Sequence, residues 1–266
     1  MSSIVKKIGI IAVVAVMSTV FWILVKPWLG DPFNYYNWQA WIAPLALLIL
    51  LSPIIVLALM LFASRWMKLV IASAVAVPFM LVFGFSWLFL TASLILLGLF
   101  VISNKYVSAE LGQRIKINTS VIMERSLKGI MLALLIMISF AYYSTPGVQE
   151  SAVSQRLPAS VKKIVETSTD VFLGSQLQEV PPNQRAQAKN QVVNQVMVEF
   201  TNLARPYFHY FPPVIAFGLF LILEGLSFIF VWLSIWLGQL IFWSLRKSGF
   251  VVVEEKEVKA EVLARL

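Results

Sequence analysis

Long uncharged apolar stretches alternate with short polar segments along this chain. A helix needs about 20 apolar residues to cross the hydrocarbon core of a bilayer. Stretches that approach or exceed this length lie at 8–25, 41–64, 69–104, 129–145 and 212–245. The pattern predicts an all-α, polytopic membrane bundle.

The stretch from Leu69 to Asn104 is too long for one span. As a single helix it would reach about 54 Å, whereas the hydrocarbon core is about 30 Å thick. The sequence FGFSW at 83–87 offers a turn, which predicts two spans near 69–83 and 86–103. The total is then about six transmembrane helices.

The last apolar stretch, 212–245, contains a single charge, Glu224. Two spans would fit by length, but they would place Arg246 and Lys247 outside, against the usual bias of basic residues toward the cytoplasm. We therefore predict one long helix, or one span with a kinked interfacial extension.

Two polar segments show helical periodicity. Segment 104–128 has acidic and basic residues at i,i+4 spacing, which predicts amphipathic helices on the cytoplasmic surface. Segment 146–211 has two amphipathic patterns separated by Pro181-Pro182, which predicts an extracytoplasmic helical hairpin between the last two spans. The predicted divisions are a five-span region (1–145), the hairpin (146–211), the last helix (212–245) and a charged cytoplasmic tail (246–266).

The charge distribution predicts the orientation. The chain is 59% hydrophobic and 13% charged, with a net charge of +8, whereas soluble domains have about a quarter charged residues. With six spans, Lys26 is the only basic residue in a short outer loop, so both termini of this multi-pass cell-membrane protein are expected in the cytoplasm. The basic excess then faces the inner leaflet, where it would attract anionic lipid, and binding to nucleic acid is not needed to explain it.

The N-terminal apolar stretch also has a feature of secretory signals, because Lys6 and Lys7 precede it. No A-x-A-like cleavage site follows 8–25, and the next residues are Lys26 and Pro27. We expect an uncleaved first helix.

Glu224 is the strongest candidate for a functional residue. Counted from Pro212 it lies near mid-bilayer, where a charge is costly. It could be a protonatable site in a transport path, or a neutral carboxyl that ties helices together. Hydroxyl groups that could accept or donate a hydrogen bond there belong to Ser18, Thr19, Ser73, Thr91, Ser93 and Ser139.

Other features indicate packing and anchoring. Small residues at helix-packing spacing in the last span are Gly218, Gly225, Ser234 and Gly238. Interfacial anchors are expected at Trp28, Trp41, Trp66 and Trp243. Prolines at 44, 53 and 78 could break spans two and three, as in transporters, although proline is also common in spans without such a role.

Catalytic motifs are missing from the sequence. There is no cysteine, only one histidine, and no H-E-x-x-H, P-loop or G-x-S-x-G motif. No catalytic residue, metal ligand or cofactor site is predicted. The sequence favours a non-enzymatic scaffold or assembly component that lies in the bilayer. It would bind a second copy of itself or another membrane protein through its helical bundle and outer hairpin. The alternative is a small transporter or channel that uses Glu224.

The orientation can be tested by labelling, because the native chain lacks cysteine. Single cysteines at Asn34 and Gln155 should react with an impermeant maleimide in intact cells. Cysteines at Ser108 and Val258 should react only after permeabilisation. External labelling at Ser108 would reverse the predicted orientation.

Overall fold

The computed structural model describes residues 3–33, 39–62, 64–113, 119–154 and 182–251, and these residues form helices joined by short turns, without strands. The all-α prediction is confirmed for them. The helices are α1 (Ser3–Trp28), α2 (Gln39–Leu61), α3 (Arg65–Phe83), α4 (Trp87–Gln113), α5 (Thr119–Tyr143), α6 (Pro146–Ser154), α8 (Pro182–Ala204), the 3₁₀ helix η3 (Arg205–Tyr210) and α9 (Phe211–Lys247).

Five of the described helices are long and apolar enough to cross a membrane: α1, α2, α3, α4 and α9. The apolar helix α5 is not among these five. It is instead the central helix of the bundle, packed on α4, α9 and α2, and it is buried along most of its length. The count of six spans therefore stays a prediction.

The predicted turn at 83–87 is present. α3 ends at Phe83 and α4 begins at Trp87. Gly84 between them has a φ of 98°, a conformation that residues with a side chain rarely adopt. The rings of Phe79 and Phe89 then pack edge to face across the turn, with their centroids 5.3 Å apart.

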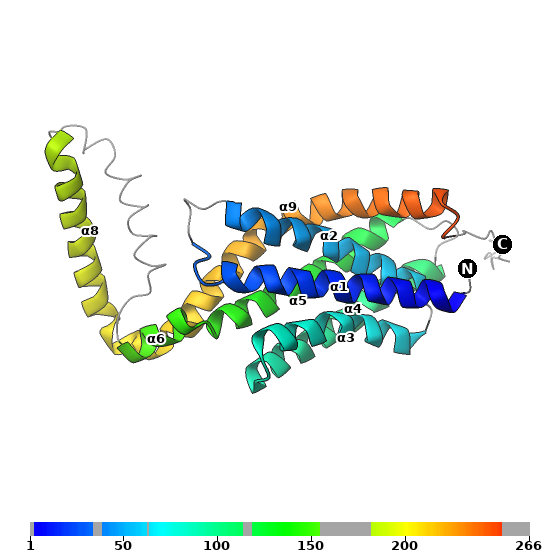
Figure 1. Cartoon of the computed structure of the whole chain (residues 1–266), viewed down its shortest axis with the longest axis horizontal. Helices are drawn as coiled ribbons and strands as arrows, with labels where there is room; N and C mark the ends of the chain where they lie inside the picture. The colour runs from blue at the N-terminus through cyan, green and yellow to red at the C-terminus, as the bar shows by residue number, and fades with distance from the viewer. Residues whose placement is uncertain (1–2, 34–38, 63, 114–118, 155–181, 252–266) are drawn as a thin grey trace, which may run out of the picture.

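The last apolar stretch forms one continuous helix. α9 has 37 residues, which gives a length of about 55 Å. Figure 1 shows its first half running obliquely along the bundle and its second half lying alongside α2. Its length therefore comes from one long inclined helix, not from two spans.

Segment 104–128 was predicted to form surface helices, and the structure differs from this prediction. α4 continues to Gln113 and α5 already begins at Thr119, so most of the segment extends two bundle helices. An ion pair between Arg125 and Glu110, at 2.6 Å, joins these extensions. The amphipathic pattern arises because one side of each extension packs on the other and the opposite side is exposed.

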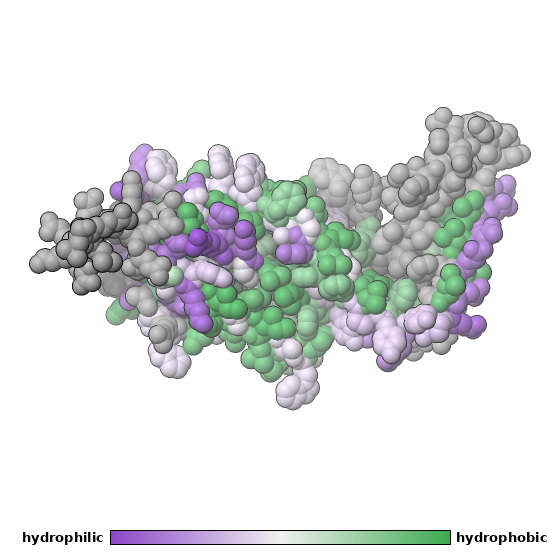
Figure 2. Space-filling model, turned by 180° about the vertical axis from the view of Figure 1, so that it is seen from behind, coloured by the Kyte–Doolittle hydropathy of each residue, from purple (hydrophilic) through white to green (hydrophobic). Residues whose placement is uncertain are grey.

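The beginning of α1 and the end of α9 lie at the same end of the bundle, opposite α6 and α8 (Figure 1). We call it the basic end, because the helix ends that meet there contain Lys6, Lys68, Lys105, Arg125, Lys128, Arg246 and Lys247. Figure 2 shows hydrophilic residues toward this end and along α8, with hydrophobic residues covering the middle. This distribution is the one on which the predicted orientation depends.

The predicted outer hairpin is described only in part. α6 and α8 fall within 146–211, and α8 coincides with the second predicted amphipathic helix. The first predicted helix, near 161–172, lies outside the described residues. The hairpin arrangement therefore stays a prediction.

The close packing of α9 on α2 and α5 can be tested at Gly238. A Cβ there would lie 3.0 Å from the Pro53 Cβ and 3.0 Å from the Met123 Cε. Because the proline ring cannot move aside, Gly238→Ala should lower the free energy of unfolding by about 1–3 kcal/mol. Thermal unfolding in detergent measures this.

Gly98→Ala is the matched control, because a Cβ at Gly98, in the middle of α4, meets nothing within 4 Å. It should not lower stability. Equal stability of the two variants would contradict the close approach of α9 to α2.

Candidate functional site

The position of Glu224 follows from the register between α9 and α2. The Ser234 hydroxyl donates a hydrogen bond of 3.0 Å to the carbonyl of Ile49, 185 residues away in the sequence. Gly238 lies against Pro53 one turn further on, and these two residues are separated by the same number of positions in the sequence. Over this turn the two helices therefore run parallel with a constant register.

Glu224 lies ten residues before Ser234, about 15 Å back along α9. Glu224 thus lies toward the end of the bundle opposite the basic end. Figure 1 shows that the first turns of α9 extend obliquely past that end. The mid-bilayer depth of Glu224, counted from Pro212, stays a prediction.

The side chain of Glu224 is exposed on the outside of the bundle. No hydrogen bond or ion pair joins it to another described residue. Several hydroxyls proposed as its partners bond instead to the backbone of their own helix. These bonds run from Thr19 to Ala15, from Thr91 to Trp87, from Ser93 to Phe89 and from Ser139 to Leu135.

The four small residues of α9 lie on two different faces. Ser234 and Gly238 are buried against α2 and α5. Gly218 and Gly225 face away from the bundle, and a Cβ on either would meet nothing within 4 Å. Sequence spacing identified all four as packing residues but did not show that only two of them pack within the chain.

The open glycines belong to a longer stripe, which we call the α9 seam. Its members recur every three or four residues, the spacing that keeps side chains on one face of a helix. Leu221, Phe228 and Trp232 are 52%, 70% and 65% exposed. The α9 seam comprises Gly218, Leu221, Gly225, Phe228 and Trp232.

The tryptophans predicted as interfacial anchors also differ in their surroundings. Trp66 and Trp243 are exposed near the basic end, and the Lys247 ammonium lies 5.1 Å from the centre of the Trp243 ring. Trp28 is buried and packs edge-on against Trp41, with ring centroids 5.1 Å apart.

The prolines do not interrupt their helices. α2 continues through Pro44 and Pro53, and α3 continues through Pro78. Half-helix ends that could hold an ion, as in broken-helix transporters, are therefore not formed at these positions.

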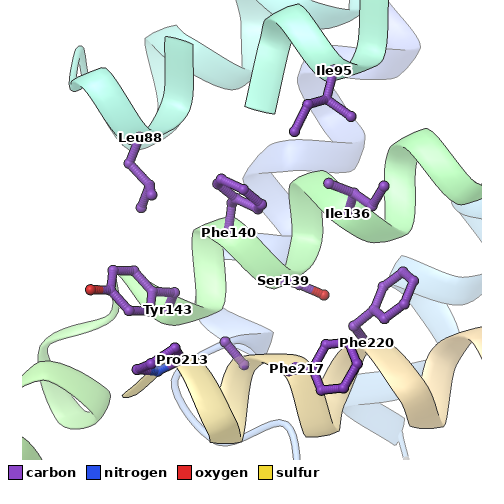
Figure 3. Close-up of a pocket in the computed structure, with 10 residues that line it drawn as sticks. Leu88, Ile95, Ile136, Ser139, Phe140, Tyr143, Pro213, Phe217 and Phe220 are labelled. Carbon is purple, nitrogen blue, oxygen red and sulfur yellow. The ribbon is translucent and has the colours of Figure 1, made fainter. Parts of the chain in front are cut away.

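A cavity of about 550 Å³ lies between α4, α5 and α9. Figure 3 shows aromatic rings from two helices along it, Phe140 from α5 and Phe217 and Phe220 from α9. Its lining is almost entirely apolar and does not include Glu224. Such a cavity suits an apolar group, not an ion or a proton relay.

Metal chemistry has no visible basis in the described part of the chain, where no group of three His, Cys, Asp or Glu side chains could hold an ion. Comparison with protein-family models, curated proteins and solved structures finds no match. The class is therefore defined by the fold: a helical bundle with five helices long and apolar enough to cross a membrane.

Two glutamates provide a test of whether the Glu224 side chain is exposed on the outside of the bundle. Glu110 is buried and paired with Arg125, whereas Glu224 is exposed on α9. Glu110→Gln should lower the free energy of unfolding by roughly 1–2 kcal/mol, because a hydrogen bond to a charged group is weakened. Glu224→Gln should change it by less than about 0.5 kcal/mol.

Chemical or thermal unfolding of the purified chain in detergent gives both values. A loss for Glu224→Gln as large as that for Glu110→Gln would mean that the Glu224 carboxyl has a partner inside the bundle.

Proposed function

We propose that this protein is a non-enzymatic membrane scaffold that assembles with a different membrane protein through the α9 seam. The observation that carries the proposal is the pair of open glycines, Gly218 and Gly225, on the outward face of α9. The rest of the bundle packs on the opposite face of the same helix, at Ser234 and Gly238.

Exposed leucine or phenylalanine alone would not support a contact, because lipid tails are as apolar as these side chains. Helices associate in lipid where small residues let two backbones approach, which adds van der Waals contact that lipid cannot supply. Gly218 and Gly225 lie seven residues apart, with Leu221 between them and Phe228 following. A partner helix could therefore lie between large side chains and directly against the backbone.

Glu224 favours a different protein as the partner rather than a second copy. It lies beside the α9 seam, next to Gly225. A parallel pair of α9 helices would bring two Glu224 carboxylates to the same contact, and like charges disfavour such pairing. A helix with a lysine, arginine or hydroxyl at that level would complement it, as flanking charges select partners in coiled coils.

The outer helix α8 offers a second contact surface. Figure 1 shows α8 projecting from the bundle beyond η3. Val196, Val198 and Leu203 are 41%, 59% and 75% exposed on it. Exposed apolar side chains outside the bilayer often mark a contact with another protein. A partner with a domain on the same side of the membrane as α8 would bury them.

The transport alternative has less support. A protonatable residue in a transport path has to face a cavity between helices, whereas Glu224 is exposed on the outside of α9. It does not line any of the three cavities described near α4–α5–α9, α2–α3–α4 and α1–α2–α9.

A photo-crosslinking experiment tests the proposal. Benzoylphenylalanine at Leu221, on the α9 seam, should give an adduct with another membrane protein in native membranes. The same group at Leu94, 58% exposed on α4, is the control and should give none. The adduct should map to a transmembrane helix of the partner that has a basic or hydroxyl side chain near the site.

Dependence on the glycines and on Glu224 makes the test specific. Gly225→Ile should abolish the adduct, whereas Gly98→Ile on α4 should leave it. Glu224→Lys should weaken it, and an acidic substitution at the partner's donor residue should restore it.

An adduct of about twice the 29.9 kDa chain mass would show a homodimer and overturn the choice of partner. Equal adducts at Leu221 and Leu94 would overturn the α9 seam itself.

A further inference from the structure

The α3–α4 turn brings two lysines together that lie far apart in the sequence. Lys68 and Lys105 are the charged residues that flank the uncharged stretch Leu69–Asn104. Because the chain reverses at Gly84, both ends of that stretch return to the basic end, where both lysines line one cavity of about 450 Å³.

Polar groups converge at one side of this cavity. The Lys68 ammonium donates hydrogen bonds to the Asn104 Oδ1 at 2.6 Å and to the Ser108 Oγ at 3.4 Å. The Ser108 hydroxyl in turn donates to the same Asn104 oxygen at 3.4 Å. The amide nitrogen of Asn104 is a further donor, and Lys105 is exposed beside it.

The rest of the lining is apolar. Leu59, Ala72 and Phe100 are buried at the base of the cavity. Leu69, Leu97 and Val101 complete its walls. The cavity therefore has a cationic rim and a hydrocarbon-like interior, the two halves of an amphiphile binding site.

Negative charge is missing from this cavity. No Asp or Glu is among its lining residues, and no described carboxylate forms an ion pair with Lys68 or Lys105. Arg125 and Lys128 at the same end of the bundle do have such partners, Glu110 and Glu124. Within the described residues, therefore, no carboxylate compensates the two ammonium groups.

We infer that this cavity binds an anionic membrane lipid. Its phosphate would contact Lys68, Lys105 and the polar groups of Asn104 and Ser108, and an acyl chain would lie on the apolar lining. Trp66, 78% exposed two residues before Lys68, marks the depth at which lipid headgroups are found. This inference rests on membrane insertion and is independent of the partner proposed for α9.

The neighbouring groove between α1, α2 and α9 is a weaker site for an anion. Its one cation, Lys6, already donates to the Phe250 carbonyl at 3.1 Å and lies 4.9 Å from the centre of the Phe250 ring. The α3–α4 cavity is distinguished by its second cation, Lys105, which makes no hydrogen bond to a described residue, and by the amide nitrogen of Asn104 beside it.

Native mass spectrometry of the full chain in detergent tests the inference, with phosphatidylglycerol and phosphatidylcholine as probes. The wild type should retain the anionic lipid preferentially. Lys68→Gln/Lys105→Gln should weaken its retention roughly 10- to 30-fold, the effect expected for two basic residues near a lipid surface. The control Arg246→Gln/Lys247→Gln removes the same charge at the same end, outside the cavity, and should weaken it less than about threefold.

Two further variants keep the result clear if the double variant folds poorly. Lys105→Gln alone removes an exposed side chain without a hydrogen bond to a described residue, and should weaken retention roughly fivefold. Val101→Trp should fill the apolar part of the cavity and weaken lipid retention while leaving the polar groups in place.

Inorganic phosphate distinguishes a lipid site from a site for a soluble anion. It should displace the lipid poorly, because it cannot use the apolar lining. Full displacement by phosphate together with normal retention by Val101→Trp would assign a soluble anion and overturn the inference. Equal losses of lipid retention for the Lys68/Lys105 double variant and the Arg246/Lys247 control would mean that general surface charge causes the effect. That result would overturn the inference as well.

Discussion

The structure depends on the close contact of α9 with α2 and α5 around Gly238. A glycine at this point lets Pro53 and Met123 come within 3.0 Å of where a side chain would begin. The Ser234 hydrogen bond to Ile49 fixes the same register one turn earlier. Because a helix is rigid, this one contact determines which face of α9 is outward, and so places Gly218, Gly225 and Glu224 outside the bundle.

The length of the apolar stretches predicted most helices because lipid leaves the backbone few other choices. Unpaired peptide groups are too costly in hydrocarbon, so a long apolar stretch has to be helical, and a stretch too long for one span has to turn where glycine permits it. Gly84 met that requirement. Segment 104–128 did not follow the same reasoning, since the Glu110–Arg125 ion pair joins α4 to α5, and a charge pattern along the sequence does not show such a pairing.

Side-chain roles were harder to predict than helices because they depend on tertiary register. Glu224 was expected in the bundle, as a transport residue or a buried tie, since its depth was counted along one helix. Its exposure is set by the orientation of α9, which a count along one helix does not give. Lys68 and Lys105 each looked like an ordinary flanking charge, and only the reversal at Gly84 makes them neighbours in one cavity.

The α9 seam and the lipid cavity lie on different parts of the bundle, and this separation has a consequence. α3 packs chiefly on α1 and α4, whereas α9 packs chiefly on α5 and α2. α4 and α5 pack on each other, so the two surfaces are linked through rigid helices without sharing a residue. A partner helix on α9 would therefore leave the cavity between α3 and α4 open to the surrounding lipid. Binding at one site then need not exclude binding at the other, which suits a scaffold that holds its partner while a lipid at the basic end fixes its depth in the membrane.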